Sequence, residues 1–350
     1  MKTNHLFIVL ASILLISCTK EEIKLETEIQ LVLDNLTKDQ KEIVFLDNNQ
    51  IITIANPYTN RGGMVLKGSL HNHTDNSVLV DGYKSGNPRE IAIKFRNYGN
   101  YDFFAITDHN YVTHDPGIEG IVWMGVSMED TKVSHHLVVY NLPENYKYTD
   151  LGDDINEQIA YYHSIGAVVS YAHPDWDGAY QSNEMIVATD AVDFVENLTP
   201  SSTNPRAYNL LLAKGPIWGV GTDDYHYNAS WQDPDMYFDK SCIYVYADEK
   251  SREAIWRAIM SGCFYASQGT RMDISCNNGK IVVTTEIPST IDVMGVNLQH
   301  PENEWVISSV WNAKEMHYQI DGTVPIVWIR VRNEQGMAYS QAFRVISEDD

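Results

Sequence analysis

Histidines and carboxylates stand directly after several short apolar segments of this chain, and this placement constrains the fold more than any other feature. The motifs are His71-Asn72-His73, Thr107-Asp108-His109, Glu129, His173-Pro174 and Asp224-Tyr225-His226. In a parallel α/β sheet, the carboxyl ends of the strands open on one edge, where binding sites are built. We therefore expect these separated motifs to meet at one rim of a sheet or barrel.

The region from about residue 65 to 265 alternates apolar segments of strand length with segments of helical character. The expected strands are 65–70, 101–107, 121–126, 137–142, 167–172, 192–198 and 217–221, and the expected helices are 88–98, 153–165 and 205–213. Asn87 provides a cap and Pro88 a favourable first-turn residue for the first of these helices. The alternation favours a parallel α/β sheet, either open or closed into a barrel.

The pattern changes after residue 268, where short apolar segments follow one another without helical periodicity. Turn residues such as Asn277-Asn278-Gly279 and Asp321-Gly322 separate them. These features are typical of a small all-β unit, and we predict a β-sandwich-like module over residues 269–350. An extension of the preceding sheet is the alternative. Residues 19–64 are expected to form a tether and a peripheral segment.

The N-terminal residues 2–17 resemble an export signal, because a lysine precedes an apolar segment, 6–16, that is too short to span a bilayer comfortably. The segment ends in Leu15-Ile16-Ser17-Cys18, which resembles the lipobox of bacterial lipoproteins. We expect residues 1–18 to be a lipoprotein signal and Cys18 to carry the lipid. The protein would then be anchored to the membrane of the bacterial cell envelope. An ordinary signal peptide or a single anchor helix is the alternative.

The remaining cysteines are Cys242, Cys263 and Cys276. Outside the cytoplasm disulfides are permitted, but an odd set allows at most one, and the spacing does not select its partners. No CxxC pair is present, so the sequence does not indicate a thiolate zinc site.

The excess of acidic residues limits the kinds of partner that the protein can bind. Lysine and arginine together number 25 and aspartate and glutamate 47, which gives a formal net charge of −22. Proteins that bind extended nucleic acid through its phosphates need a positive surface, so this class is disfavoured. The sequence does not indicate an oligomeric state.

The residue types of the motifs indicate a particular class of metal. Imidazoles and carboxylates without thiolates suit zinc, manganese or iron. The alternation in His71-Asn72-His73 places both imidazoles on one side of an extended segment, so that they can share one ion. The two oxygens of Glu129 can bridge two cations, and neighbouring cations polarise a phosphoryl oxygen and activate water. We therefore expect two or three divalent metal ions.

The motifs, in this order, resemble the PHP family, named for polymerase and histidinol phosphatase. The segments that carry the resemblance are His71-Asn72-His73-Thr74-Asp75-Asn76-Ser77, Ile106-Thr107-Asp108-His109-Asn110, Ser170-Tyr171-Ala172-His173-Pro174 and Gly221-Thr222-Asp223-Asp224-Tyr225-His226. The resemblance implies an α/β fold, a distorted seven-stranded β/α barrel over residues 65–268 that holds two or three metal ions. The usual activity of the family is phosphoester hydrolysis.

The resemblance also implies a role for each matching residue. A first metal ion would be held by His71, His73, Glu129 and Asp224, a second by Asp81, His109 and His226, and a third by Glu129, His136 and His173, with Glu129 bridging. Asp108 would orient the ligands through hydrogen bonds rather than bind metal. Asp224 is preferred to Asp223 because the family pattern is Asp-x-His.

Two of these metal-ligand assignments, Asp81 and His136, are less direct. In the family an Asp-Gly often follows the motif serine directly, whereas a short insertion separates Ser77 from Asp81 here. His135 and His136 are adjacent candidates for one ligand. His136 is preferred because, like the ligand of the family, it directly precedes a strand-like segment.

The expected activity is hydrolysis of a phosphate ester by attack of a metal-bound hydroxide on phosphorus. The proton for the leaving group would come from His135 or from a metal-bound water. A basic residue should hold the remaining phosphate charge, and Arg206, Lys84 and Arg61 are the candidates. A solvated surface position is the simpler explanation for each of these three.

The expected substrate is a small exported phosphoester, such as a nucleotide or a sugar phosphate. An exported protein has little access to histidine biosynthesis, and the acidic balance disfavours long DNA. A metal-dependent amide or lactone hydrolase is a second possibility, since related barrels with His-x-His hydrolyse such bonds. A third is a non-catalytic lipoprotein that binds glycans through Trp305, Trp311 and Trp328.

Overall fold

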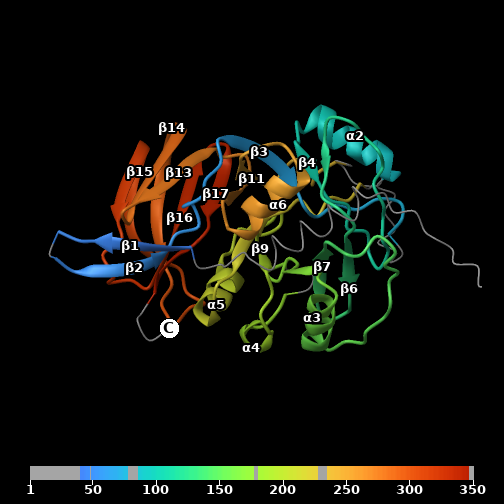
Figure 1. Ribbon diagram of the computed structural model, residues 1–350, viewed down its shortest axis with the longest axis horizontal. Coiled ribbons are helices and arrows are strands. Elements are labelled where there is room, and N and C mark those ends of the chain that lie inside the picture. Colours follow the sequence, from blue (N-terminus) through green and yellow to red (C-terminus); the bar gives the residue numbers. More distant parts are fainter. Residues whose placement is uncertain (1–39, 48, 78–85, 177–179, 228–234, 347–350) are drawn as a thin grey trace, which may run out of the picture.

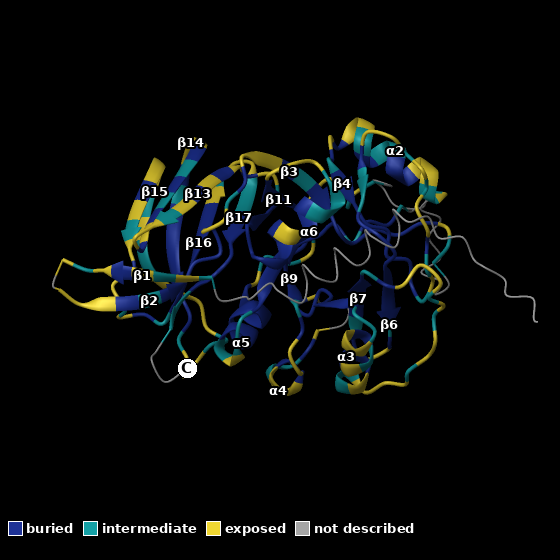
Figure 2. Ribbon diagram, in the orientation of Figure 1, coloured by how far each residue is buried: buried dark blue, intermediate teal, exposed yellow. Residues whose placement is uncertain are grey.

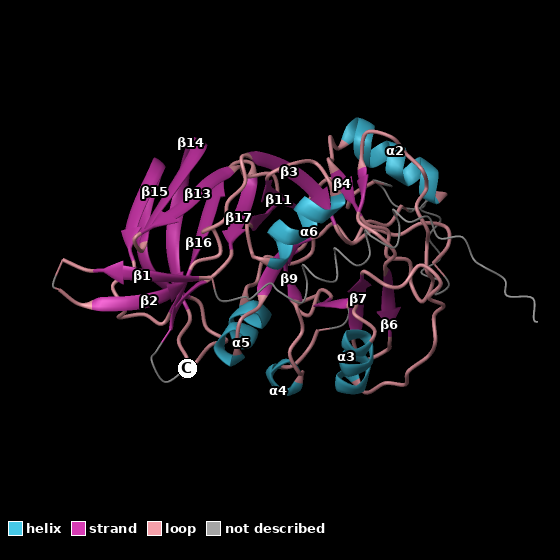
Figure 3. Ribbon diagram, in the orientation of Figure 1, coloured by secondary structure: helices cyan, strands magenta, loops and turns pink. Residues whose placement is uncertain are grey.

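The computed structural model describes residues 40–47, 49–77, 86–176, 180–227 and 235–346 (Figure 1). The predicted lipidation site Cys18, the predicted ligand Asp81 and the predicted phosphate-binding Lys84 lie outside the described residues. Helices occur in one half of the molecule, whereas long strands fill the other half (Figure 3).

The described part of the chain is rich in strands. Its strands are β1 (Lys41–Phe45), β2 (Ile51–Ala55), β3 (Met64–Ser69), β4 (Phe103–Phe104), β5 (Val122–Trp123), β6 (Met128–Thr131), β7 (His136–Tyr140), β8 (Val168–Tyr171), β9 (Phe194–Leu198), β10 (Trp218–Gly221), β11 (Cys242–Ala247), β12 (Phe264–Ser267), β13 (Met272–Asn277), β14 (Lys280–Gly295), β15 (Trp305–Gln319), β16 (Ile326–Asn333), β17 (Gly336–Ser340) and β18 (Phe343–Ile346). The helices are α2 (Pro88–Tyr98), α3 (Ile155–Ser164), α4 (Asn183–Ala188), α5 (Arg206–Lys214) and α6 (Arg252–Met260).

Local sequence signals explain where several elements begin. Helix α2 starts at the expected proline, and Asn87 and Glu90 form a capping box that satisfies backbone donors at this end. The turn between β13 and β14 places Asn278 at φ 49° and Gly279 at φ 68°. A two-residue hairpin turn of this kind requires positive φ at both central positions, which Asn and Gly tolerate.

The strands belong to two sheets rather than to one closed barrel. A 13-stranded sheet contains the path β1-β2-β18-β16-β17-β12-β11-β3-β4-β5, and a 5-stranded sheet has the order β10-β9-β8-β7-β6. The expected parallel pairing is present in β8-β9-β10 and in β3-β4-β5, whereas β6, β7 and β8 pair antiparallel. The connection from β6 to β7 is a hairpin closed by Lys132 N and His135 O, too short for a parallel crossover.

The two sheets meet where the predicted motifs lie. An isolated parallel bridge joins Asn72, after β3, to Tyr225, after β10. A second one joins His109, after β4, to Glu129 in β6. These bridges bring the strand ends of one sheet against those of the other, and the described strands form no continuous hydrogen-bonded barrel beyond them.

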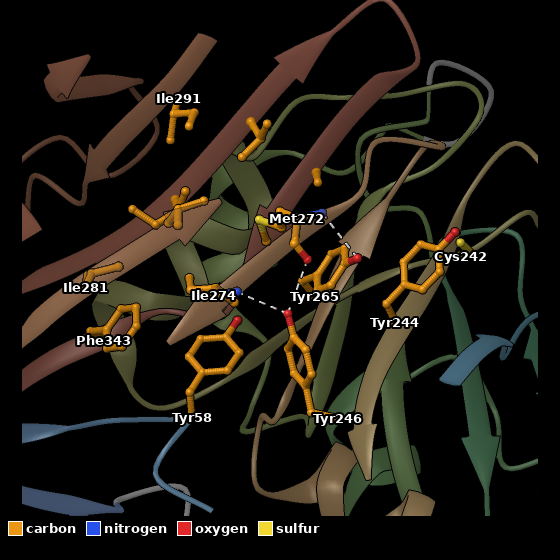
Figure 4. Packing of buried hydrophobic residues seen from close by; sticks show 14 of the residues in the cluster. Tyr58, Cys242, Tyr244, Tyr246, Tyr265, Met272, Ile274, Ile281, Ile291 and Phe343 are labelled. Atoms are coloured by element: carbon orange, nitrogen blue, oxygen red, sulfur yellow. Dashed lines mark hydrogen bonds between the residues drawn. The ribbon is translucent and has the colours of Figure 1, made fainter. Parts of the chain in front are cut away.

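The strands after residue 268 form an all-β region, as expected, and they also pair with strands of the larger sheet. Strand β17 pairs with β12, and β18 pairs with β2 of the N-terminal hairpin. Tyrosine hydroxyls reinforce the junction: Tyr246 lies 3.3 Å from both Met272 O and Ile274 N (Figure 4). Among the described residues 269–346, all regular elements are strands.

The hydrophobic core consists of three clusters of buried side chains. Strands β6, β9 and β16 are buried along most of their length and are coloured dark blue in Figure 2. Trp328 belongs to this core and not to a glycan-binding surface, since its indole is buried against Tyr208 and Tyr339. Among the described helices, none is long and apolar enough to cross a membrane.

Gly68 lets β3 lie directly beside β4, the strand that leads to Asp108 and His109. The two strands are paired at Gly68 and Phe103, and a Cβ atom at position 68 would overlap the Phe103 ring. Gly63 provides a control, because a Cβ atom there meets nothing within 4 Å.

We predict that Gly68→Ala lowers the free energy of unfolding by about 1–3 kcal/mol, as overpacking in a core does. Gly63→Ala should change it by less than about 0.5 kcal/mol. Urea unfolding of both variants tests this. Equal stability of Gly68→Ala and the parent would show that β3 and β4 are not so closely packed.

Candidate metal site

The predicted motifs converge on one buried cluster. Three groups have ligand atoms within 4.8 Å of one another: His71, His73 and Asp224; His73, His109 and His226; and Glu129, His136 and His173. Two of the groups share His73, and the third contacts them through Glu129, whose Oε2 lies 3.5 Å from His73 Nε2. The second group contains His73 where the sequence suggested Asp81, which lies outside the described residues.

Strand ends place these side chains. His71 and His73 follow β3, Asp224 and His226 follow β10, and His173 follows β8. Three further ligand candidates come from β4 and the β6–β7 hairpin, namely His109, Glu129 and His136. His173 (φ 26°) and Asp224 (φ 46°) have positive φ, a conformation that non-glycine residues seldom adopt and that often marks functional sites.

Imidazole nitrogens face one another at distances suited to a shared ligand. His71 Nε2 lies 3.1 Å from His73 Nε2, and His109 Nε2 lies 3.3 Å from His226 Nε2. If both rings of a pair carry lone pairs on Nε2, the two atoms repel each other unless a cation lies between them. Once the proton shared by such a pair is displaced, the two Nε2 lone pairs can bind one cation, so the arrangement fits a shared metal ion.

Hydrogen bonds at the opposite ring nitrogen set the tautomer of several histidines. His71 Nδ1 donates to Glu196 Oε1 at 2.6 Å, and His226 Nδ1 donates to the Asp224 carbonyl at 2.9 Å. His109 Nδ1 is hydrogen-bonded to Thr131 Oγ1 at 2.7 Å. A proton held on Nδ1 leaves Nε2 with a lone pair, the form in which histidine binds metal.

Glu129 is the centre of the cluster. It is fully buried, and its Oε1 accepts from His136 Nδ1 at 2.9 Å and from His173 Nε2 at 3.2 Å. Its Oε2 receives no aligned hydrogen bond from the described residues, so the short approach of His109 is an ion-pair contact only. A buried carboxylate oxygen without an aligned donor is costly, and a bound cation would satisfy it.

The charges of the cluster shift the pKa values in opposite directions. Burial lowers the pKa of His71, but the carboxylates of Glu196, Asp224 and Glu129 raise it well above its usual value. Burial and the neighbouring His226 and His109 hold the pKa of His73 well below its usual value. Metal binding requires neutral imidazoles, so it must displace the proton that His71 retains.

Both acidic ligands stay ionised. Burial raises the pKa of Glu129, but His109, His136 and His71 lower it well below its usual range. The pKa of Asp224 is likewise lowered, because His71 and His226 outweigh burial. The Asp224 side chain is also 30% exposed, so the cluster reaches solvent at this carboxylate.

The neighbouring Asp223 has a different position. Its carboxylate accepts backbone N–H groups of Asp239, Lys240 and Ser241 at 2.6–2.8 Å. Burial raises the pKa of Asp223 to about 7, although these backbone hydrogen bonds lower it. Asp223 therefore holds the chain before β11, while Asp224 faces the cluster.

Asp108 braces the loop that carries His73. It accepts from Thr74 N at 2.6 Å, from Thr74 Oγ1 at 2.7 Å and from Ser77 Oγ at 3.1 Å. It is not a member of any of the three ligand groups. Its contacts are those of a residue that orients ligands through the backbone.

His135 does not join the cluster. Its ring nitrogens are hydrogen-bonded to Gln158 Oε1 at 2.7 Å and to Ser134 Oγ at 2.9 Å. Burial lowers the pKa of His135, which opposes the protonated form that an acid requires. These contacts engage both ring nitrogens of His135 outside the cluster, whereas its neighbour His136 contacts Glu129.

The two described arginines predicted to bind phosphate are also engaged elsewhere. Arg206 is buried, and its guanidinium donates to Asp175 Oδ1 and to Gln181 O at 2.7 Å each. Arg61 pairs with Asp273 and lies over the Tyr246 ring. In the described structure both arginines bind protein groups, and neither belongs to the three ligand groups.

Sequence reasoning missed Glu196. It lies in β9, is buried, and contacts His71 Nδ1 at 2.6 Å and His173 N at 2.9 Å. The available signal was the same as for the ligands, an acidic residue near the end of an apolar strand. Local sequence does not reveal its role, because its partners His71 and His173 are distant from it in the chain.

Comparisons with known proteins add little to this geometry. No protein-family model and no curated protein matches the chain. It is similar to the crystal structure of a two-domain protein from Bacteroides vulgatus that contains a predicted PHP-like metal-dependent phosphoesterase. The identity is 14%, the match covers 80% of this chain and 95% of that chain, and the TM-score is 0.43. A TM-score this low supports no conclusion, so the proposals below rest on the site.

We predict that His71→Ala removes most bound divalent metal while the chain stays folded, because the variant loses a ligand and no large apolar contact. His300→Ala is the control, since His300 is exposed and pairs only with a surface glutamate in the described structure. Elemental analysis of the purified proteins, with circular dichroism for the fold, tests this. Full metal content in His71→Ala would exclude His71 as a ligand.

Proposed function

We propose that this chain is a metal-dependent hydrolase of small phosphate esters. The observation that carries the proposal is the convergence of three histidine and carboxylate groups around the buried Glu129. The donor set contains nitrogen and oxygen but no thiolate, which suits zinc, manganese or iron. When bound, two or three such cations would polarise the phosphoryl group and lower the pKa of water.

Different residues of the chain would hold the cations, line the substrate entrance and position the loop that carries His73. The groups of His71, His109 and Glu129 would hold the cations at separate positions along the cluster. Asp224, the partly exposed ligand, would lie where substrate enters. Asp108 would keep the His73 loop in place through Thr74 and Ser77.

We also propose the finer points that the resemblance to the PHP family implies. The two bridges between the sheets support a barrel-like arrangement of the strand ends around the site. The lipobox-like segment supports a lipid anchor at Cys18 and a place in the bacterial cell envelope. A substrate reaching this protein would then be an exported nucleotide or sugar phosphate.

The activity is tested with a panel of an aryl phosphate, nucleoside monophosphates and sugar phosphates beside aryl amides and lactones. We predict turnover of phosphate esters that is lost after chelation, restored by zinc, manganese or iron, and at least 100-fold lower in His71→Ala. Turnover of amides or lactones with no turnover of phosphates would instead favour the second class of hydrolase.

We propose that Trp176 contacts the leaving group of the substrate. Its ring centroid lies 5.5 Å from that of His173 and nearly perpendicular to it, and the residue is 39% exposed. The preceding Asp175 is clamped by Arg206 Nε at 2.7 Å and by Ala207 N at 3.2 Å. An exposed indole on a braced turn beside a metal-ligand group suits a substrate with a planar leaving group.

Stacking of aromatic groups contributes about 0.5–1.5 kcal/mol beyond buried area. We predict that Trp176→Ala lowers kcat/KM for an aryl phosphate roughly 2- to 10-fold more than for glycerol phosphate. Trp311→Ala is the control, because Trp311 is 84% exposed and lies on β15. Equal losses for the two substrates would contradict this role of Trp176.

A further inference from the structure

We propose that Glu196 is a positioning residue that couples two metal-ligand groups through one carboxylate. The proposal rests on the metal site of the proposed function but adds a residue outside the ligand groups. Glu196 Oε1 accepts from His71 Nδ1 at 2.6 Å, and Glu196 Oε2 accepts from the backbone N–H of His173 at 2.9 Å. His71 belongs to one group and His173 to another.

Because of its location, Glu196 also connects the two sheets. It lies in β9, which pairs with β8 and β10 in the smaller sheet. His71 follows β3, which belongs to the larger sheet. One carboxylate therefore ties a ligand from each sheet, and all three residues are buried.

Only a carboxylate satisfies both donors. His71 Nδ1–H and His173 N–H each need an acceptor, and an ionised carboxylate offers one oxygen to each. A glutamine at this position has a single oxygen, and its amide nitrogen must face the other donor. Because the pocket is buried, water does not compensate for the mismatch without a rearrangement.

Each orientation of such a glutamine disturbs one ligand group. If its amide nitrogen faces His71, the amide donates to Nδ1, the imidazole proton moves to Nε2, and the lone pair for metal is lost. If the amide nitrogen faces His173, two donors oppose each other and the strand end that carries this ligand is displaced. Partners that orient metal-bound histidines typically change metal affinity 10- to 100-fold when removed.

The chain contains a matched control in Asp193, which lies just before the same strand. Asp193 Oδ2 contacts His163 Nε2 at 2.9 Å and accepts from Val169 N at 3.0 Å. It thus has the same pair of partner types, an imidazole and a backbone N–H, but neither belongs to a ligand group. Asp193→Asn makes the same chemical change without touching the metal site.

The experiment measures zinc affinity of the full chain by competition with a chromophoric chelator and records the visible absorption of the cobalt-loaded protein. We expect Glu196→Gln to bind zinc 10- to 100-fold more weakly and to change the cobalt spectrum, because a nitrogen ligand is lost or displaced. Asp193→Asn should stay within twofold of the parent. A purely structural role would lower the thermal stability of Glu196→Gln and leave its zinc affinity unchanged.

If Glu196→Gln does not fold, Glu196→Asp replaces it, since aspartate keeps the charge but is too short to reach both donors. Zinc affinity and cobalt spectrum equal to the parent in the folded variant would overturn the proposal. If the parent hydrolyses phosphate esters and the Glu196 variant keeps the zinc affinity and cobalt spectrum of the parent, only this inference is overturned. Tight zinc binding by the parent without turnover of any phosphate ester would overturn the proposed activity and leave the coupling in place.

Discussion

The structure depends on keeping a buried group of imidazoles and carboxylates together. Such a group is unfavourable in a protein interior unless every charge is compensated, because ions lose their hydration on burial. Glu129 contributes most to the compensation, as its oxygens lie within 3.6 Å of His71, His73, His109, His136 and His173. Paired in this way, the cluster joins strand ends from both sheets.

The fold serves this cluster by opposing the ends of two sheets. The larger sheet supplies His71 and His73, and the smaller sheet supplies Glu129 and His136. Two isolated bridges and the carboxylate of Glu196 join them at the level of the site. The site is thus built at a seam between sheets, where each side alone would hold an incomplete set of ligands.

The sequence predicted the convergence because strand ends in α/β folds share an edge, and the rule holds here even though the sheets are mixed. It also predicted α2 and the hairpin at Asn278-Gly279, where local residues decide the structure. It did not predict the hydrogen-bond partners of long polar side chains. The hydrogen bonds of Arg206 and His135 depend on residues distant in sequence, such as Asp175 and Gln158, and no local pattern encodes them.

The change in local pattern predicted the strands after residue 268, but the pairing of those strands is a long-range property that local pattern does not encode. Strand β12 has β11 on one side and β17 on the other. A chain ending at residue 268 would leave one side of β12 with unpaired backbone N–H and C=O groups. Such an edge recruits other chains, so the half that carries the metal ligands would aggregate if produced without its C-terminal strands.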